Sequence, residues 1–270
     1  MAVFPRGGVL TAWGNAYLVG RASLDEADVH SVGEDALHRV VGVPGETDPV
    51  PLSIALGRLR AAGVTGLRLV LPDAGDVIGL PGPPAVTAAA VTAREAVLTV
   101  GPFEVGSWAL IPTTAGDAAG IVVRWDLMAV PRSVPPAGLP TLSEAERGLA
   151  EAMTATTTTL DDLDVARGRD DIGPALAAFD RQLRGLLLPP TMPQRALRVV
   201  LAATRLLGVL ALAVESDGAA VTASEAAART AALRPLRRAA RYALCAAYSA
   251  EAEPRAGAWG GPSVGSPSHG

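Results

Sequence analysis

The sequence predicts an α+β fold, in which a mixed α/β N-terminal domain at residues 1–130 precedes an all-α, four-helix bundle at residues 141–252. Short apolar segments separated by Gly, Pro and Asn dominate the first half, and long stretches with helical periodicity dominate the second. Between them, the segment 129–140 holds four prolines, which lack the donor that helices and sheets need. We therefore expect two domains joined by a Pro-rich linker at 131–140, with a disordered tail at 253–270.

The N-terminal segment has the pattern of a β-hairpin. Residues 9–13 and 16–19 are largely apolar and flank Gly14-Asn15, a pair that favours a tight turn between strands. We expect two strands here, followed by a polar loop at 23–35 and a third strand at 38–43.

Two helix–strand units follow in the first half. Prolines open a helix that presents apolar residues on one face and stops at a glycine, and a strand comes next. A second helix and strand repeat this order, which indicates α/β units, and two antiparallel strands complete the half. The predicted order is helix 51–63, strand 66–71, helix 85–95, strand 96–100, and strands 108–111 and 121–127.

Capping boxes mark the helices of the second half, because a Ser or Thr followed three residues later by Glu or Gln satisfies free backbone N–H groups. The pairs are Ser143 with Glu146, Thr191 with Gln194, and Thr222 with Glu225. The second helix carries the apolar seam of a bundle, formed by Ile172, Leu176, Phe179, Leu183 and Leu186. These patterns predict helices at 143–165, 172–187, 194–215 and 222–251, the last kinked at Pro235.

Composition excludes several classes of function. All 23 basic residues are Arg, so Schiff-base and phosphate-loop lysines are absent. The net charge of −4 argues against a general nucleic-acid-binding protein. The single Cys fits a reducing compartment, and the N-terminus lacks a signal-peptide pattern, so we expect a cytoplasmic protein. The apolar helix at 196–214 contains Arg205 and is interpreted as a buried bundle helix rather than a membrane span.

Two segments are candidate binding sites. The loop at 72–84 follows the carboxyl end of a strand, where α/β sheets bind ligands, and its Asp73 and Asp76 could hold a hydrated Mg²⁺ or act as a base. An ordinary Asp- and Gly-rich turn is the competing interpretation. In the last helix, four arginines at i, i+3, i+4 and i+7 share one face: Arg234, Arg237, Arg238 and Arg241.

The arginine stripe has three possible counter-charges: solvent and salt, the acidic stretch Asp161–Asp171, or an acidic external partner. That stretch lacks a D-D-x-x-D metal motif and is interpreted as solvated helix ends. His30 and His38 lack a third ligand, and Cys245 lies among apolar residues, so we predict no catalytic residue, no metal and no cofactor.

The pattern therefore favours a non-catalytic intracellular interaction or regulatory protein that uses the helical C-terminal surface to bind an acidic protein surface. The alternative is a small-ligand or metal-dependent enzyme or binder centred on the loop at 72–84. The geometry of Asp73 and Asp76 discriminates between them: convergence on a concave site favours the ligand, and exposure to solvent opposes it. The sequence makes no prediction of oligomeric state.

Overall fold

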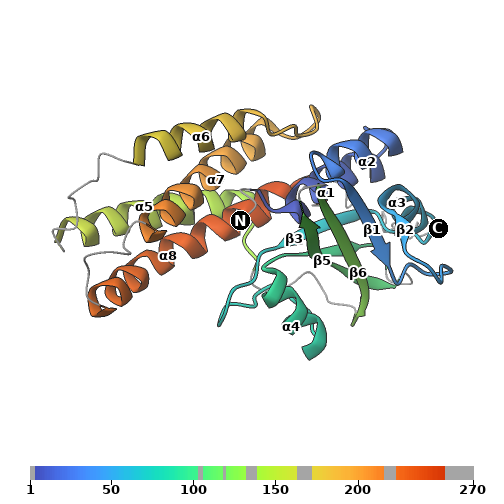
Figure 1. Ribbon diagram of the computed structural model, residues 1–270, viewed down its shortest axis with the longest axis horizontal. Helices are drawn as coiled ribbons and strands as arrows, with labels where there is room; N and C mark the ends of the chain where they lie inside the picture. Colours follow the sequence, from blue (N-terminus) through green and yellow to red (C-terminus); the bar gives the residue numbers. More distant parts are fainter. Residues whose placement is uncertain are drawn as a thin grey trace, which may run out of the picture.

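The computed structural model describes residues 4–102, 106–117, 120–131, 139–162, 172–215 and 223–252. The protein has a mixed α+β architecture, with a six-stranded sheet in the first half and helices in the second (Figure 1). The elements run α1(Arg6–Leu18), α2(Leu24–Val32), β1(Leu37–Val41), β2(Val50–Pro51), α3(Leu52–Ala61), β3(Gly66–Val70), α4(Pro84–Ala93), β4(Ala96–Val100), β5(Ser107–Asp117), β6(Gly120–Val130), α5(Leu142–Asp162), α6(Ile172–Arg184), α7(Gln194–Glu215) and α8(Ala223–Tyr248).

The sheet has the order β2-β1-β6-β5-β4-β3, and every neighbouring pair is antiparallel except β1 with β6. Helices α1, α2 and α3 lie on one face of the sheet and α4 lies on the other (Figure 1). The first face is closed by a buried cluster that includes Leu10, Trp13, Leu56 and Trp125, and the second by one that includes Val86. Alternate residues of the strands supply both clusters, as the two-residue period of a strand requires.

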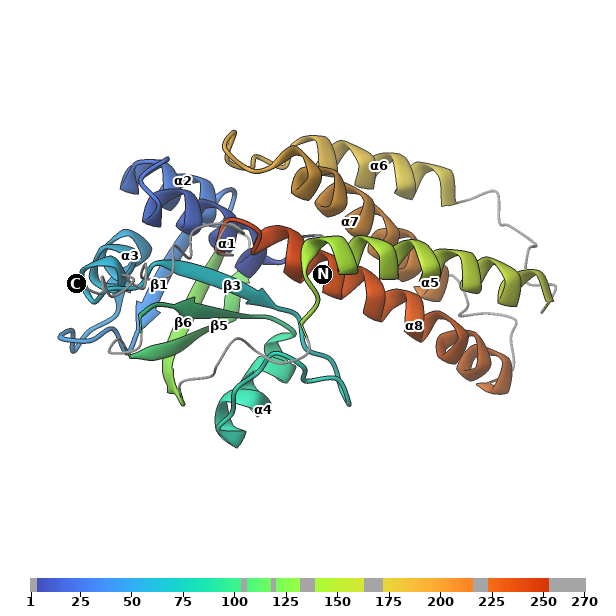
Figure 2. The ribbon, with the colours of Figure 1, turned by 180° about the vertical axis from the view of Figure 1, so that it is seen from behind.

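The described chain after residue 141 is helical, and α8 lies at its centre. Helix α8 packs against α5 and α7, and α6 packs on the outside of α7 (Figure 2). Leu149, Val200, Leu236 and Leu244 are among the buried residues that join these helices. Small alanines between them let the helices approach closely.

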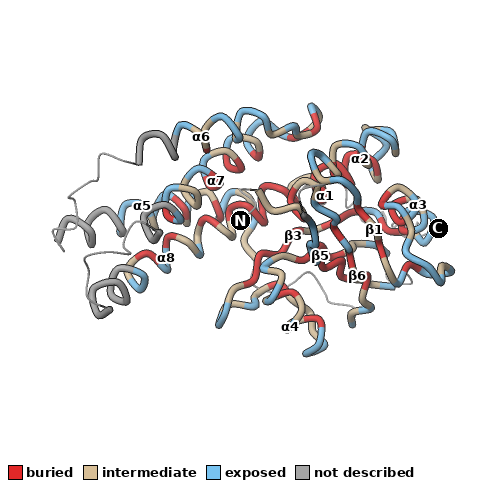
Figure 3. The backbone as a smooth tube through the Cα atoms, viewed as in Figure 1, coloured by how far each residue is buried: buried red, intermediate tan, exposed pale blue. Residues whose placement is uncertain are grey.

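Helix α8 also joins the two halves of the molecule. Ala12, Leu69 and Leu71 of the first half belong to the same buried cluster as the residues of α5, α7 and α8. Figure 3 shows the buried backbone continuing from the sheet into the end of α8. The outer edge of β3 is covered there, because the Leu69 N–H donates to Ser249 Oγ at 3.0 Å. An exposed strand edge invites pairing with another chain, and this contact helps to prevent it.

The predicted hairpin at 9–19 is wrong: these residues belong to α1. The helix is buried on nearly all sides, so it has no polar stripe that would reveal its period in the sequence. Gly14 is needed for contact rather than for a turn, because a Cβ there would lie 2.5 Å from Leu67 Cδ1. Asn15 pairs with the edge of β3: Leu67 N–H donates to Asn15 Oδ1 at 2.6 Å, and Asn15 Nδ2 donates to Leu67 O at 3.0 Å.

Other local predictions also need correction. The predicted loop at 23–35 contains α2, which begins with a complete capping box between Ser23 and Glu26. The capping box of helix α5 lies two residues earlier than predicted, between Thr141 and Glu144 instead of Ser143 and Glu146. The Thr191 hydroxyl makes no hydrogen bond, so the predicted cap of α7 is absent.

The remaining predicted strands and helices of the first half lie within three residues of their predicted bounds, except β5, which continues six residues further, to Asp117. Their connection differs, because β3 and β4 pair antiparallel and the expected α/β units are therefore not formed. The rule that parallel sheets bind ligands at their carboxyl edge consequently gives no support to a site at 72–84. Thr222, most of the predicted linker and the tail lie outside the described residues.

Candidate functional site

The two candidate binding segments of the sequence meet each other in the structure. Arg241 of α8 donates from Nη2 to Asp76 Oδ2 at 2.6 Å and from Nη1 to the carbonyl of Leu71. The side chains of Arg241 and Asp76 are 13% and 12% exposed. One counter-charge of the arginine stripe is thus Asp76 in the loop of the N-terminal half, which the three alternatives drawn from the sequence did not include.

The loop places Asp76 by a tight backbone turn. Asp73 and Asp76 exchange two backbone hydrogen bonds of 2.9 Å, and Gly75 between them has a φ of +78°, which favours glycine. Asp73 Oδ1 accepts from the Ala74 N–H at 2.9 Å, as expected for an Asp that stabilises its own turn. The two carboxylates therefore do not converge on a common ligand position: one supports the turn and the other contacts α8.

Tyr242 completes this contact, although the sequence analysis did not select it. Its hydroxyl donates to Asp76 Oδ1 at 2.7 Å and accepts from Arg238 Nε at 3.0 Å. Burial, together with the hydrogen bond to Asp76, raises the pKa of Tyr242 above its ordinary value. The spacing of Arg238 and Tyr242 by four residues on one helix was the available signal, since such pairs lie side by side.

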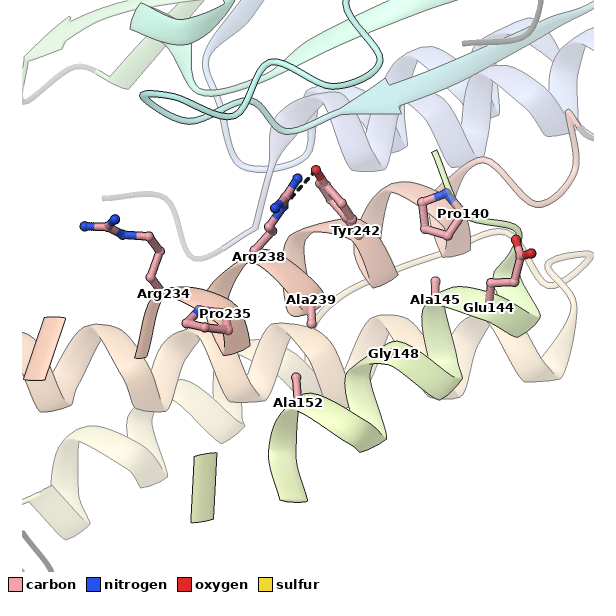
Figure 4. A pocket seen from close by; sticks show the side chains of 10 residues that line it. All are labelled: Pro140, Glu144, Ala145, Gly148, Ala152, Arg234, Pro235, Arg238, Ala239 and Tyr242. Carbon is pink, nitrogen blue, oxygen red and sulfur yellow. Dashed lines mark hydrogen bonds between the residues drawn. The ribbon is translucent and has the colours of Figure 1, made fainter. Parts of the chain in front are cut away.

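Beside this contact, an open groove runs between α5 and α8 near the N-terminal half. It has a volume of about 470 Å³, and its lining residues are Pro140, Glu144, Ala145, Gly148, Ala152, Arg234, Pro235, Arg238, Ala239 and Tyr242. Figure 4 shows the alanine side chains pointing into the space between the two helices, with Arg234, Arg238 and Tyr242 along the α8 side. The floor of the groove therefore consists of small apolar residues, and the rim formed by α8 carries positive charge.

The four arginines of the stripe have different surroundings. Arg241 is committed to Asp76, and Arg238 lies 3.4 Å from the same carboxylate with half of its side chain exposed. Arg234 is exposed and Arg237 half-buried, and neither has a carboxylate partner among the described residues. The acidic stretch Asp161–Asp171 lies outside the residues whose side chains are described, so its pairing with the stripe stays a prediction.

A second polar network connects α1 with strands β1 and β6. Asp35 accepts two hydrogen bonds from Arg6, at 2.6 and 2.8 Å, and contacts His38 Nε2 at 3.1 Å. Trp125 Nε1 donates to His38 Nδ1 at 3.3 Å, so the proton of neutral His38 is on Nε2. Burial lowers the pKa of His38, and this neutral imidazole serves to link three elements of the core.

The other candidate residues of the sequence have structural surroundings. His30 stacks on Trp13 with ring centroids 4.1 Å apart. Cys245 is buried, which raises the pKa of its thiol to about 12 and makes it a poor nucleophile. Within the described ranges, no three His, Cys, Asp or Glu side chains are grouped to hold a metal ion. In the same ranges, no helix combines the length and apolar character needed to cross a membrane.

Comparison with known families assigns both halves of the chain. Residues 8–140 match the model of the N-terminal domain of Rv1486c-like proteins, and residues 143–245 match the model of the C-terminal domain. No curated protein and no solved structure gives a significant match. Because both models represent one family and together extend over most of the sequence, the chain belongs to the two-domain family of Rv1486c-like proteins.

Proposed function

We propose that this protein is a non-catalytic intracellular interaction or regulatory protein that binds an acidic partner through the surface of α5 and α8. The observation that supports the proposal most directly is the groove between these helices, with its apolar floor and its arginine rim. Apolar area supplies binding energy, and guanidinium groups select carboxylates by their paired donors. Arg side chains are also frequent among residues that dominate binding energy.

The helices form a suitable platform for such a surface. We propose that α5 to α8 make an antiparallel four-helix bundle, supported by the central position of α8 between α5 and α7. Helix α8 is further held against the first half of the molecule by two contacts. Arg241 donates to Asp76, and Ser249, directly after the helix, accepts from the Leu69 N–H. A surface held in this way loses little conformational entropy on binding, which favours affinity.

The alternative, a ligand or metal site in the loop at 72–84, has weaker support. The Asp76 carboxylate already receives donors from Arg241 and Tyr242, and Asp73 accepts from its own turn. A ligand would have to displace these contacts. Binding of a divalent metal or a sugar phosphate that is lost in Asp73→Asn, with an unchanged melting temperature, would favour this alternative.

Charge reversal on the groove rim tests the proposed function. The double variant Arg234→Glu/Arg238→Gln places no new carboxylate beside Asp76, so its melting temperature should change little, and it should lose proteins that co-purify with the wild type from cells expressing the chain. The matched control is Arg181→Glu/Arg184→Gln, which makes the same substitutions at two exposed arginines on α6. Retention of the same partners by both double variants would refute the proposal.

A further inference from the structure

The groove between α5 and α8 has a floor without large side chains. Ala145, Gly148 and Ala152 lie at i, i+3 and i+7 on α5, and Ala239 lies opposite on α8. An ideal Cβ added to Gly148 would meet no atom within 4 Å. The space above this glycine is therefore open, and a bulky side chain from outside could enter it.

The groove is long enough for two turns of a helix. Its lining residues extend from Glu144 to Ala152 on one side and from Arg234 to Tyr242 on the other. Eight residues of helix correspond to about 12 Å along the axis. A helix from a partner would lie in the groove and pack against both α5 and α8.

The rims differ in charge, which restricts the occupant. Arg234 and Arg238 are four residues apart on the α8 rim. Arg238 donates from Nε to Tyr242 and lies beside Asp76, and its guanidinium carbon lies 5.2 Å from the centroid of the Tyr242 ring. Half of its side chain is exposed, so the outer side of the guanidinium can meet a carboxylate. The α5 rim instead carries Glu144, and the exposed Glu151 follows Gly148 by three residues on the same helix, so this side disfavours a uniformly acidic ligand.

We infer that the groove binds an amphipathic helix of a partner protein, which inserts a bulky apolar side chain above Gly148 and sets carboxylates at i and i+4 against Arg234 and Arg238. The spacing of two carboxylates on one helical face equals that of the two arginines, so both pairs can form together. This inference rests on the proposed function, and it adds the structural class of the partner segment. Helix-in-groove recognition of this kind uses one apolar face with charged flanks.

The test uses two short fluorescent helical peptides and the full-length protein. The first has leucines on one face with Glu at i and i+4 beside them, and the second has Gln in place of both Glu. Fluorescence anisotropy should give about tenfold tighter binding of the Glu peptide, since loss of charge-assisted hydrogen bonds costs about this much. Equal affinities, or no binding of either peptide at millimolar concentration, would overturn the inference.

Filling the groove provides the second arm. Gly148→Leu should fold normally, because the added side chain enters open space and leucine favours a helix more than glycine. It should weaken binding of the Glu peptide about tenfold or more, whereas Gly57→Leu on α3, which also meets no atom within 4 Å, should not. Unaltered binding to Gly148→Leu would overturn the inference. If co-purifying partners are lost with the arginine substitutions but kept by Gly148→Leu, the groove mode fails while the proposed function stands.

Discussion

A single buried polar residue, Asn15, satisfies backbone hydrogen-bonding groups at the edge of the sheet. Asn15 supplies both a donor and an acceptor to Leu67 on the outer edge of β3, and its side chain is fully buried. An amide side chain carries a donor and an acceptor on neighbouring atoms, so it can satisfy the N–H and the C=O of one residue together. The sequence presents Asn15 beside a glycine, which is a common turn pair, and nothing in the pair indicates a partner 52 residues away.

Glu95 is the second informative residue. It precedes β4 directly after Arg94, which has a φ of +62°, and its Oε2 accepts from the Gly7 N–H at 2.7 Å at the beginning of α1. Burial raises the pKa of Glu95 to about 7, and the bond from Gly7 and the charge of Arg6 oppose this effect without cancelling it. The folded protein therefore holds the Glu95 proton more tightly than the unfolded chain does.

This shift predicts a pH dependence of stability. A raised pKa stabilises the fold below the ordinary value of 4.5, and the contribution is lost as pH rises toward about 7. Glu95→Gln keeps an acceptor for Gly7 and cannot ionise. The free energy of unfolding of the variant, relative to that of the wild type, should therefore increase as the pH rises across this interval. Urea denaturation of both proteins measures the difference.

The comparison between the two proteins is essential, because His38 acts in the opposite direction. Its lowered pKa removes stability as pH falls through the ordinary value of 6.5, equally in wild type and variant. A difference in unfolding free energy that stays constant from below pH 4.5 to above pH 7 would show that Glu95 is not the titrating group.

At the scale of elements, the contact between α8 and the loop after β3 is the most specific feature. Helix α8 serves two purposes: one face fills the core of the helical half, and the other binds Asp76 and the Leu71 carbonyl. The arginine stripe could be predicted from helical periodicity alone. Its counter-charge could not, because local patterns do not reveal which distant loop the helix reaches.

Breaking this contact should destabilise the protein. Arg241→Ala leaves the Asp76 carboxylate with one strong donor in a site only 12% exposed, and we expect a loss of about 3 kcal/mol. Arg237→Ala, with no partner in the described chain, should change stability by less than about 0.5 kcal/mol.

A double-mutant cycle with Asp76→Ala isolates the pair. Urea denaturation of the two single variants and the double variant should give a coupling energy of about 1 kcal/mol or more. Strict additivity of the two substitutions would mean that the ion pair contributes nothing to the joining of α8 and the loop.

At the scale of the whole molecule, the sequence predicted the mixed first half and the helical second half because both rest on periodicity. Strand β6 alternates visibly from Val123 to Leu127, and α6 has a clear apolar seam in the sequence. Helix α1 could not be predicted, since it is buried on nearly all sides and contains glycines that permit close packing. Antiparallel pairing of β3 with β4 was also missed, because helix–strand order alone does not fix strand direction.

The candidate site shows the same division. Arg234, Arg238 and Asp76 were selected from sequence. Tyr242 was not, because its contact with Asp76 depends on the loop that α8 reaches, and the groove depends on the side-by-side packing of α5 and α8. The alanines of the groove floor are ordinary helix formers in the sequence. Their significance arises only when two helices place them face to face.

Site-specific photo-crosslinking tests the central proposal, a partner held on the groove between α5 and α8, most directly. A photoreactive amino acid is introduced at position 151, an exposed residue of α5 three residues after Gly148, and for comparison at position 181, an exposed residue on α6. Irradiation of cells expressing each protein, followed by mass spectrometry, identifies what lies beside each position. The account predicts a protein adduct at position 151 whose crosslinked segment is an acidic amphipathic helix, and no such adduct at position 181. Absence of any protein adduct at position 151, or the same adduct at both positions, would contradict it.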